Sequence, residues 1–153
     1  MEKKFFNYYF EYGGTVGNLI SNSGNYCGIY LIALPENFKK QPFNECSKLK
    51  MWKDRKVSAP IEELTNKWVE NTDILYIGKS ESKIVKKRII EHFAFWNGNK
   101  TAAYGGRVIG QIPNFENLYV WYLKCEQPKE IEKKLLKMFK NQYGKLPFAN
   151  YSL

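Results

Sequence analysis

The strongest constraint on the fold is a set of three short runs of apolar and aromatic residues, set far apart along the chain. They cover residues 26–34 (YCGIYLIAL), 73–79 (DILYIGK) and 118–124 (LYVWYLK). Runs of this length and composition are typical of β-strands. Because each run is apolar at odd and even positions alike, we expect a sheet that is covered on both faces.

Two further segments have the periodicity and the ends of helices. The first spans residues 82–97, with Ser80 or Ser82 as its N-cap and Gly98 directly after its end. Its apolar positions recur at helical spacing: Val85, Ile89, Phe93 and Trp96.

The second segment spans residues 128–143, with Pro128 in its first turn and Gly144 beyond its end. A weaker helical pattern covers residues 60–70. Helices therefore alternate with strands in an order that predicts an α+β fold, with helices packed on an antiparallel or mixed sheet.

Size and charge narrow the class of protein. A chain of 153 residues is expected to form one domain, here residues 1–153. Its formal net charge of +9 suits a protein that binds a polyanion, although a solvated lysine-rich surface explains the charge equally well. No apolar run is long enough to cross a bilayer, so no membrane association is expected. Three cysteines without a CxxC pair predict neither a disulfide framework nor a zinc site, and suit a reducing cytoplasm.

Three polar residues stand out from the helical patterns. Glu132 falls on the same helix face as Leu135, Leu136 and Phe139. A carboxylate at the edge of a core normally has a cation or several donors as partners, although a boundary glutamate paired with a lysine is the ordinary alternative. Arg88 and His92 are four residues apart on the earlier helix and share one flank, where they suit phosphate binding and proton transfer. A packed imidazole is the alternative for His92.

The three expected strands and two helices carry a set of motifs in a recognisable order. Gly28-Ile29-Tyr30 and Tyr76-Ile77-Gly78 lie on the first two strands. They are followed by Lys79, by Arg88 and His92, by ExxLLK from Glu132, and by a terminal PFAN ending at Asn150. In this combination the chain, from residue 26 to its end, resembles the GIY-YIG nucleases. The stretches AYGGRVIGQI and YGKLPFAN also resemble a bacterial branch that contains restriction-type and stand-alone nucleases.

The resemblance implies a small, mainly antiparallel three-stranded sheet flanked by helices. In compact members a short hairpin joins the first two motif strands, so residues 35–72 are expected to form an insertion. Residues 1–25 are then an N-terminal extension. The insertion is rich in lysine and contains Trp52, which fits either a DNA-reading element or a mobile solvated loop.

The resemblance also implies a metal-dependent DNA endonuclease with one Mg²⁺ or Mn²⁺ per active site, held by Glu132. In that scheme Tyr30 is the general base, Lys79 lowers the pKa of Tyr30, and Tyr76 helps to orient the water. Arg88 contacts the scissile phosphate, His92 assists, and Asn150 ties the tail to the site. Core packing is the alternative for both tyrosines, in a chain with 11 of them.

DNA is the implied partner. We expect the backbone of the duplex to lie along Lys86, Lys87 and Arg107, with Gly105 and Gly106 allowing a close approach. Cutting both strands with one site per chain suggests a homodimer. An enzyme that cuts double-stranded DNA is the leading interpretation, with restriction or defence as a candidate role. A nicking or structure-specific repair nuclease, and a catalytically silent nucleic-acid-binding module, are the alternatives.

Overall fold

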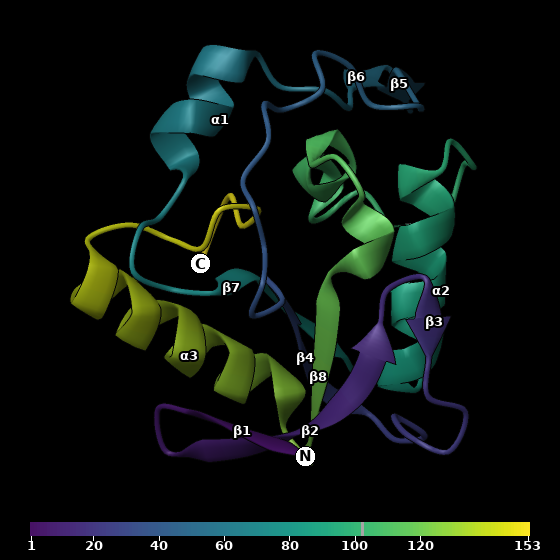
Figure 1. The fold of residues 1–153 in the computed structure, drawn as a ribbon. Coiled ribbons are helices and arrows are strands. Elements are labelled where there is room, and N and C mark those ends of the chain that lie inside the picture. The colour runs from purple at the N-terminus through teal and green to yellow at the C-terminus, as the bar shows by residue number, and fades with distance from the viewer. Residues whose placement is uncertain (102) are drawn as a thin grey trace.

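The computed structural model describes residues 1–101 and 103–153, which form an α+β fold around one antiparallel sheet (Figure 1). The strand order is β1-β2-β8-β4-β7. Strand β3 lies outside this order and pairs with the last two residues of β2, Gly14 and Thr15. The strands are β1 (Glu2–Phe5), β2 (Tyr8–Thr15), β3 (Asn18–Leu19), β4 (Gly28–Ala33), β7 (Ile74–Ser80) and β8 (Tyr119–Lys124).

The three strands expected from the sequence are β4, β7 and β8, and they are neighbours in the sheet. The expected number of strands was wrong, because residues 1–25 contribute three more and the sheet has six strands. Strand β2 pairs with β8, which would otherwise be an exposed edge. The extension escaped prediction because β2 is buried on only part of its surface and carries few apolar residues at regular spacing.

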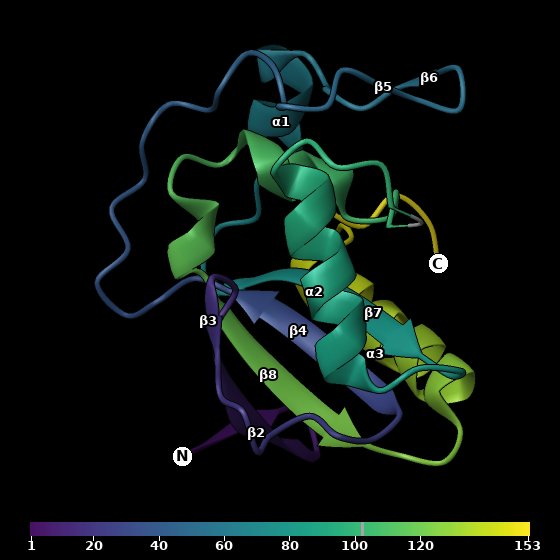
Figure 2. The same cartoon turned by 90° about the vertical axis from the view of Figure 1, so that its right-hand side faces the viewer.

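Strand β4 lies between β7 and β8, and all six of its residues are buried. Tyr30 and Ile32 belong to one core, whereas Ile29, Leu31 and Ala33 belong to the other. Helix α2 (Val85–Trp96) packs into the first core and helix α3 (Pro128–Tyr143) into the second. The two helices lie on opposite faces of the sheet (Figures 1 and 2). The prediction of a sheet covered on both faces is therefore confirmed.

Helix α3 has the expected bounds, begins with Pro128, and ends at Gly144 in the left-handed conformation with a φ of 81°. Helix α2 begins later than expected, and neither serine is its N-cap, because Ile84 holds that position without a side-chain hydrogen bond. Instead, the Val85 amide donates to the Tyr26 carbonyl at 2.8 Å. The first turn is thus satisfied by backbone from the segment before β4, a long-range contact that no local sequence pattern reveals.

The insertion, residues 35–72, contains a small hairpin and a helix shorter than the expected 60–70. Its elements are β5 (Met51–Trp52), β6 (Arg55–Lys56) and α1 (Ile61–Lys67). Val57, Leu64 and Trp68 are buried in the core beside α2, so this part of the insertion is packed rather than a solvated loop. Two 3-10 turns, η1 (Arg107–Gln111) and η2 (Phe115–Asn117), connect α2 to β8.

Gln111 joins the insertion to the rest of the domain. Its side chain is fully buried, accepts a hydrogen bond from the Ala59 amide at 2.8 Å, and donates to the carbonyls of Ala59 at 2.9 Å and Asn44 at 3.0 Å. One amide side chain therefore satisfies three backbone groups that would otherwise be desolvated without partners.

Among the helices of the described residues, none has the length and apolar character needed to span a membrane.

Replacing Gln111 by alanine should lower the free energy of unfolding by about 2–3 kcal/mol, because buried backbone groups lose their partners. It should also expose the insertion to limited trypsin digestion. Urea unfolding and mapping of the tryptic fragments test both effects. Gln41→Ala, the same change at an exposed position of the insertion, is the control. Equal stability and equal digestion of the two variants would contradict the role of Gln111.

Candidate active site

Tyr30 is the buried centre of the candidate site. Its side chain is 1% exposed and projects from β4 towards α2, where its hydroxyl lies 2.7 Å from Nε2 of His92. His92 is fully buried and stacks on Trp96, with ring centroids 5.4 Å apart. Tyr30 and His92 meet because α2 packs on the face of β4 from which Tyr30 projects.

Tyr76 completes a cluster of three rings. Its centroid lies 6.0 Å from that of Tyr30 and 5.8 Å from that of His92. On β7, Gly78 is the cross-strand partner of Tyr30, and a Cβ there would come within 2.2 Å of the Tyr30 ring. A Cβ at Gly28 would come within 2.0 Å of the Leu123 carbonyl oxygen. Both glycines of the two tripeptides are thus required by close packing.

Arg88 extends from the same flank of α2 as His92. Against the larger effect of burial, the positive charge of its guanidinium lowers the pKa of Tyr30. Nη1 lies 3.5 Å from Oε1 of Glu91, and Oε2 of Glu91 accepts a 2.7 Å hydrogen bond from Lys83. Glu91 therefore orients Arg88. Sequence reasoning missed Glu91, because a glutamate three residues after an arginine is a common pair on any helix surface.

Glu132 is half-buried near the start of α3, on the face that also carries Leu135, Leu136 and Phe139. Burial raises the pKa of its carboxyl group, with Glu81 acting in the same direction and Lys79 against it. Among the described residues its carboxylate makes no hydrogen bond and no ion pair within 4.0 Å, although its charge acts on both Tyr30 and Tyr76.

Lys79 has partners other than the one that its expected role requires. The sequence suggested that Lys79 lowers the pKa of Tyr30, but Lys79 pairs with Glu81 at 2.6 Å and acts electrostatically on Glu132. The cation that acts on Tyr30 is Arg88. Lys79 is displaced from Tyr30 because successive side chains of a strand alternate between the faces of a sheet, and Tyr30 packs over Gly78.

Burial is the largest influence on the pKa values of Tyr30, Tyr76 and His92. Burial, reinforced by Tyr76 and Glu132, raises the pKa of Tyr30 well above its ordinary value, with Arg88 in opposition. Burial and the charge of Glu132 raise the pKa of Tyr76 to about 12. Burial and then Arg88 lower the pKa of His92 to about 3, with a smaller opposing effect from the Ala103 backbone. Both phenols and the imidazole are therefore neutral at neutral pH.

The loop after α2 covers Tyr76. A Cβ on Gly105 would come within 3.0 Å of the Tyr76 hydroxyl, and one on Gly106 within 3.3 Å of its ring. Gly106 has a φ of 76° and accepts a 3.1 Å hydrogen bond from Nε1 of Trp96. A side chain at either position would crowd the Tyr76 phenol, so the close packing of this loop on Tyr76 depends on both glycines.

Asn150 fastens the C-terminal tail to β7, the open edge of the sheet. Its Oδ1 accepts from the Ile77 amide at 3.0 Å, and its Nδ2 donates to the Ile77 carbonyl at 2.9 Å. The Ala149 amide also donates to the Leu75 carbonyl at 2.8 Å. These bonds fix the strand that carries Tyr76, so Asn150 acts on the candidate site through the position of β7.

The two lysines expected to face DNA on α2 differ in their surroundings. Lys86 is partly buried, and its ammonium group donates to the Ser21 carbonyl. Lys87 is exposed and projects into solvent.

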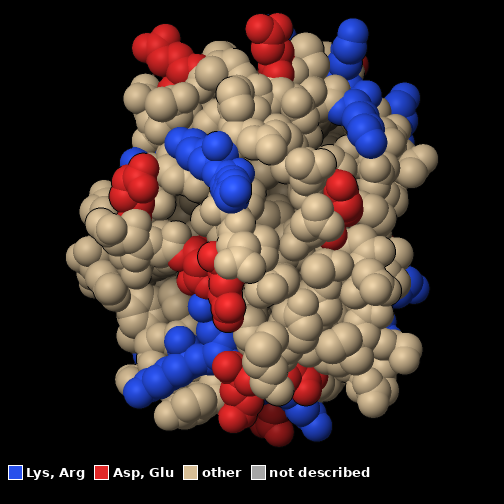
Figure 3. All heavy atoms as spheres, viewed as in Figure 1, with Lys and Arg blue, Asp and Glu red and all other residues tan. Residues whose placement is uncertain are grey.

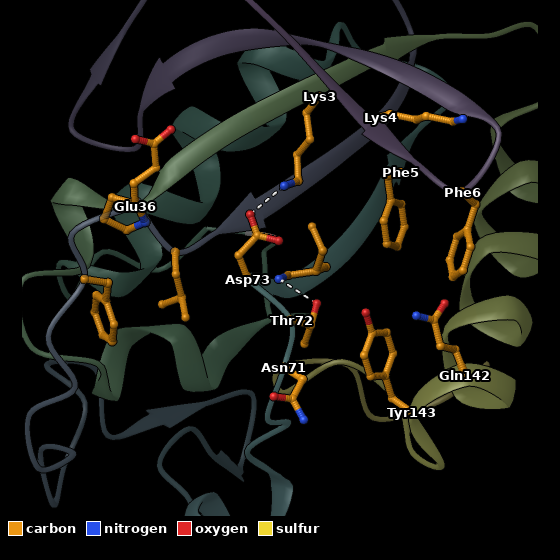
Figure 4. Close-up of a pocket in the computed structure, with 14 residues that line it drawn as sticks. Lys3, Lys4, Phe5, Phe6, Glu36, Asn71, Thr72, Asp73, Gln142 and Tyr143 are labelled. Atoms are coloured by element: carbon orange, nitrogen blue, oxygen red, sulfur yellow. Dashed lines mark hydrogen bonds and ion pairs between the residues drawn. The ribbon is translucent and has the colours of Figure 1, made fainter.

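A cavity of about 630 Å³ lies away from these residues. It is lined by the β1–β2 turn, the segment after β4, the start of β7 and the end of α3 (Figure 4). Lys3 and Asp73 form a 2.5 Å ion pair on its wall, and Phe5 and Tyr143 flank it. The residues of the motifs do not line this cavity, so we place the candidate site at Tyr30 instead.

Comparison with known proteins finds no match. No protein-family model, no curated protein and no solved structure is similar to this chain.

His92 makes stability depend on pH. Its pKa in the folded protein is about 3, below the ordinary 6.5, so the unfolded chain binds a proton that the folded chain excludes. This contribution is complete above pH 6.5 and is lost as pH falls towards 3. Between pH 7 and pH 5 the wild type should lose about 2 kcal/mol that a His92→Gln variant keeps.

Urea unfolding of both proteins at the two pH values measures the difference. The raised pKa of Glu132 contributes stability of the opposite sign, but it is common to both proteins and cancels. A difference between the two proteins that is independent of pH would show that His92 is not buried in the neutral form.

Proposed function

We propose that this protein is a metal-dependent endonuclease of the GIY-YIG type that hydrolyses phosphodiester bonds in DNA. The observation that carries the proposal is the convergence of Tyr30, Tyr76, Arg88 and His92 in one contact cluster, with the charge of Glu132 acting on both phenols. These residues come from β4, β7, α2 and α3, and a buried phenol and imidazole beside a partly exposed guanidinium are a combination typical of a functional site.

The arrangement of the fold supports the same assignment. The two motif strands β4 and β7 are paired, and their register places Tyr30 opposite Gly78. Helices α2 and α3 follow in the order that the resemblance requires. In this proposal the three-stranded unit β8-β4-β7 is the family's sheet, with residues 1–25 and 35–72 as additions to it.

Glu132 fits a hard divalent cation. Its carboxylate is half-buried, lacks hydrogen-bond partners among the described residues and has a pKa raised by burial, all of which favour a bound cation over a bare charge. No cluster of three or more acidic, histidine or cysteine side chains is present in the described part of the chain. Mg²⁺, which takes few carboxylates and keeps waters and phosphate oxygens, suits such a site and would supply positive charge to the phosphoryl group.

Arg88 binds the scissile phosphate in this scheme. Glu91 pairs with the guanidinium, and the charge of Arg88 acts on Tyr30, so a phosphate oxygen meets a cation that is already oriented beside the phenol. Pairing of Arg88 with a phosphate also cancels part of the positive charge that lowers the pKa of His92.

Tyr30 and His92 act together as the proton acceptor. Burial raises the pKa of Tyr30, so a free phenolate is not available. Instead, the Tyr30 oxygen accepts a proton from the attacking water while its own proton passes to Nε2 of His92, 2.7 Å away. Tyr76 adds a second hydroxyl beside Tyr30 that orients the water. The transfer leaves a positive charge on His92, which a phosphate bound to Arg88 would help to stabilise by offsetting the charge of the guanidinium.

Removing the carboxylate tests the proposal. Glu132→Ala should cut supercoiled plasmid at least about 100-fold more slowly than wild type in the presence of Mg²⁺, because charge on the phosphoryl oxygens is no longer neutralised. Tyr30→Phe should slow cleavage by about 10²- to 10⁴-fold, as expected for the loss of a proton acceptor. Gel analysis of nicked, linear and supercoiled DNA measures both rates and separates a nicking from a double-strand enzyme.

Glu130→Ala and Tyr9→Phe are the matched controls, since both residues are exposed and lie outside the cluster. They should cut at the wild-type rate. If wild type and Glu132→Ala behave alike, the protein is not a nuclease of this type, and a catalytically silent nucleic-acid-binding module replaces the proposal.

A further inference from the structure

Three separate segments meet beside Tyr76 and build a row of alternating cations and aromatic rings. The segments are the β5–β6 hairpin with α1, the loop after α2, and the C-terminal tail, which lie on one side of the molecule (Figure 2). We call this row the cation–aromatic ridge, and it consists of Trp52, Arg55, Lys67, Tyr104, Arg107 and Tyr151.

The aromatic rings hold the two arginines in fixed positions. The guanidinium of Arg55 lies 4.4 Å from the centroid of Tyr104 and 5.2 Å from that of Trp52. Arg107 lies 4.4 Å from the same Tyr104 ring and 4.1 Å from Tyr151. Stacking occupies the faces of a guanidinium and leaves its N–H edges available. Neither arginine has an ion pair or a side-chain hydrogen bond within the part of the chain that the structure describes.

The positive charge of the ridge is not balanced locally. Lys67 lies 4.2 Å over Tyr151. Its pKa is lowered by burial and by the like charges of Arg107 and Lys145, with only Glu63 opposing them. Glu63 itself accepts a 2.9 Å hydrogen bond from the Tyr151 hydroxyl. Basic side chains also gather at the end of the molecule formed by β5 and β6 (Figure 3).

The ridge is continuous with the candidate active site. Tyr104 and Arg107 flank Gly105 and Gly106, the two residues that cover Tyr76. Tyr151 directly follows Asn150, whose side chain is bonded to β7. A strand whose phosphate reached Arg88 would therefore pass the ridge as it left the site.

We infer that the cation–aromatic ridge binds the phosphodiester backbone of the nucleic acid on one side of the scissile bond. This inference rests on the proposed nuclease function and names the surface that positions its substrate. A row of oriented guanidinium edges suits successive phosphates of a polyanion, because each fork can bind two oxygens of one phosphate. The insertion is then a substrate-binding element, held against the domain by Gln111.

Binding in EDTA tests the inference apart from cleavage. Fluorescence anisotropy of a short labelled duplex, and of its single strand, gives Kd for wild type and for the double variant Arg55→Ala/Arg107→Ala. Each lost arginine should weaken binding about 10-fold. Each should also reduce the slope of log Kd against log salt by about 1, because one phosphate contact is lost. Comparison of the two probes identifies which form of the backbone the ridge binds.

The matched control is Lys133→Ala/Lys137→Ala, which removes two exposed cations from α3, on the far side of the molecule from the hairpin (Figure 1). It should keep the wild-type Kd and slope. Arg55→Lys/Arg107→Lys should recover the salt slope while binding remains weaker, because charge returns without the planar fork. Thermal unfolding confirms that each variant is folded at the temperature of the assay.

The inference is overturned if wild type binds neither probe, if the arginine variant keeps the wild-type Kd and slope, or if the α3 control loses as much. Failure of the nuclease proposal has a different signature, since Glu132→Ala would then cut plasmid like wild type whatever the binding data show.

Discussion

A phenol in the middle of a fully buried strand is the constraint on which the site depends. The Tyr30 side chain is 1% exposed, so its hydroxyl requires a protein partner, and His92 provides one at 2.7 Å. The ring also needs space on the neighbouring strand, which only Gly78 leaves open. Packing of β4 against β7 and α2 is therefore tied to the geometry of the Tyr30–His92 pair, and neither can change alone.

The charges of the site are arranged on opposite sides of this neutral cluster. Arg88 approaches from α2, and Glu132 acts from α3, on the other face of the sheet. Strand β7 lies between the two helices at the edge of the sheet. Asn150 of the C-terminal tail, rather than a further strand, forms hydrogen bonds with this edge. An edge without a further strand allows a carboxylate from one face to act on phenols that pack on the other.

The additions to the sheet have distinct physical roles. The N-terminal strands pair with β8 and leave β4 central and buried. The insertion contributes buried Leu64 and Trp68 to the core and presents an exposed basic hairpin beside the tail. Trp52 stacks on Tyr104 with centroids 5.1 Å apart, so the hairpin is fixed relative to the loop that covers Tyr76.

The sequence alone determined the local elements. Continuous apolar runs and helix-end signals placed β4, β7, β8 and α3, because strand composition and helix termini depend on neighbouring residues. The same patterns singled out Arg88, His92 and Glu132 as polar groups next to apolar stripes. They missed β1 to β3, whose exposed face weakens the pattern, and they assigned Ser80 or Ser82 as a cap that the backbone of Tyr26 makes unnecessary.

Only the tertiary structure decided which charges act on which groups. It assigned Arg88, not Lys79, to Tyr30, and it revealed Glu91 as the residue that orients Arg88. It also brought Arg55, Arg107 and Tyr151 together from three distant segments. The physical reason is that electrostatic and stacking energies depend on distance in space, whereas a sequence pattern reports only distance along the chain.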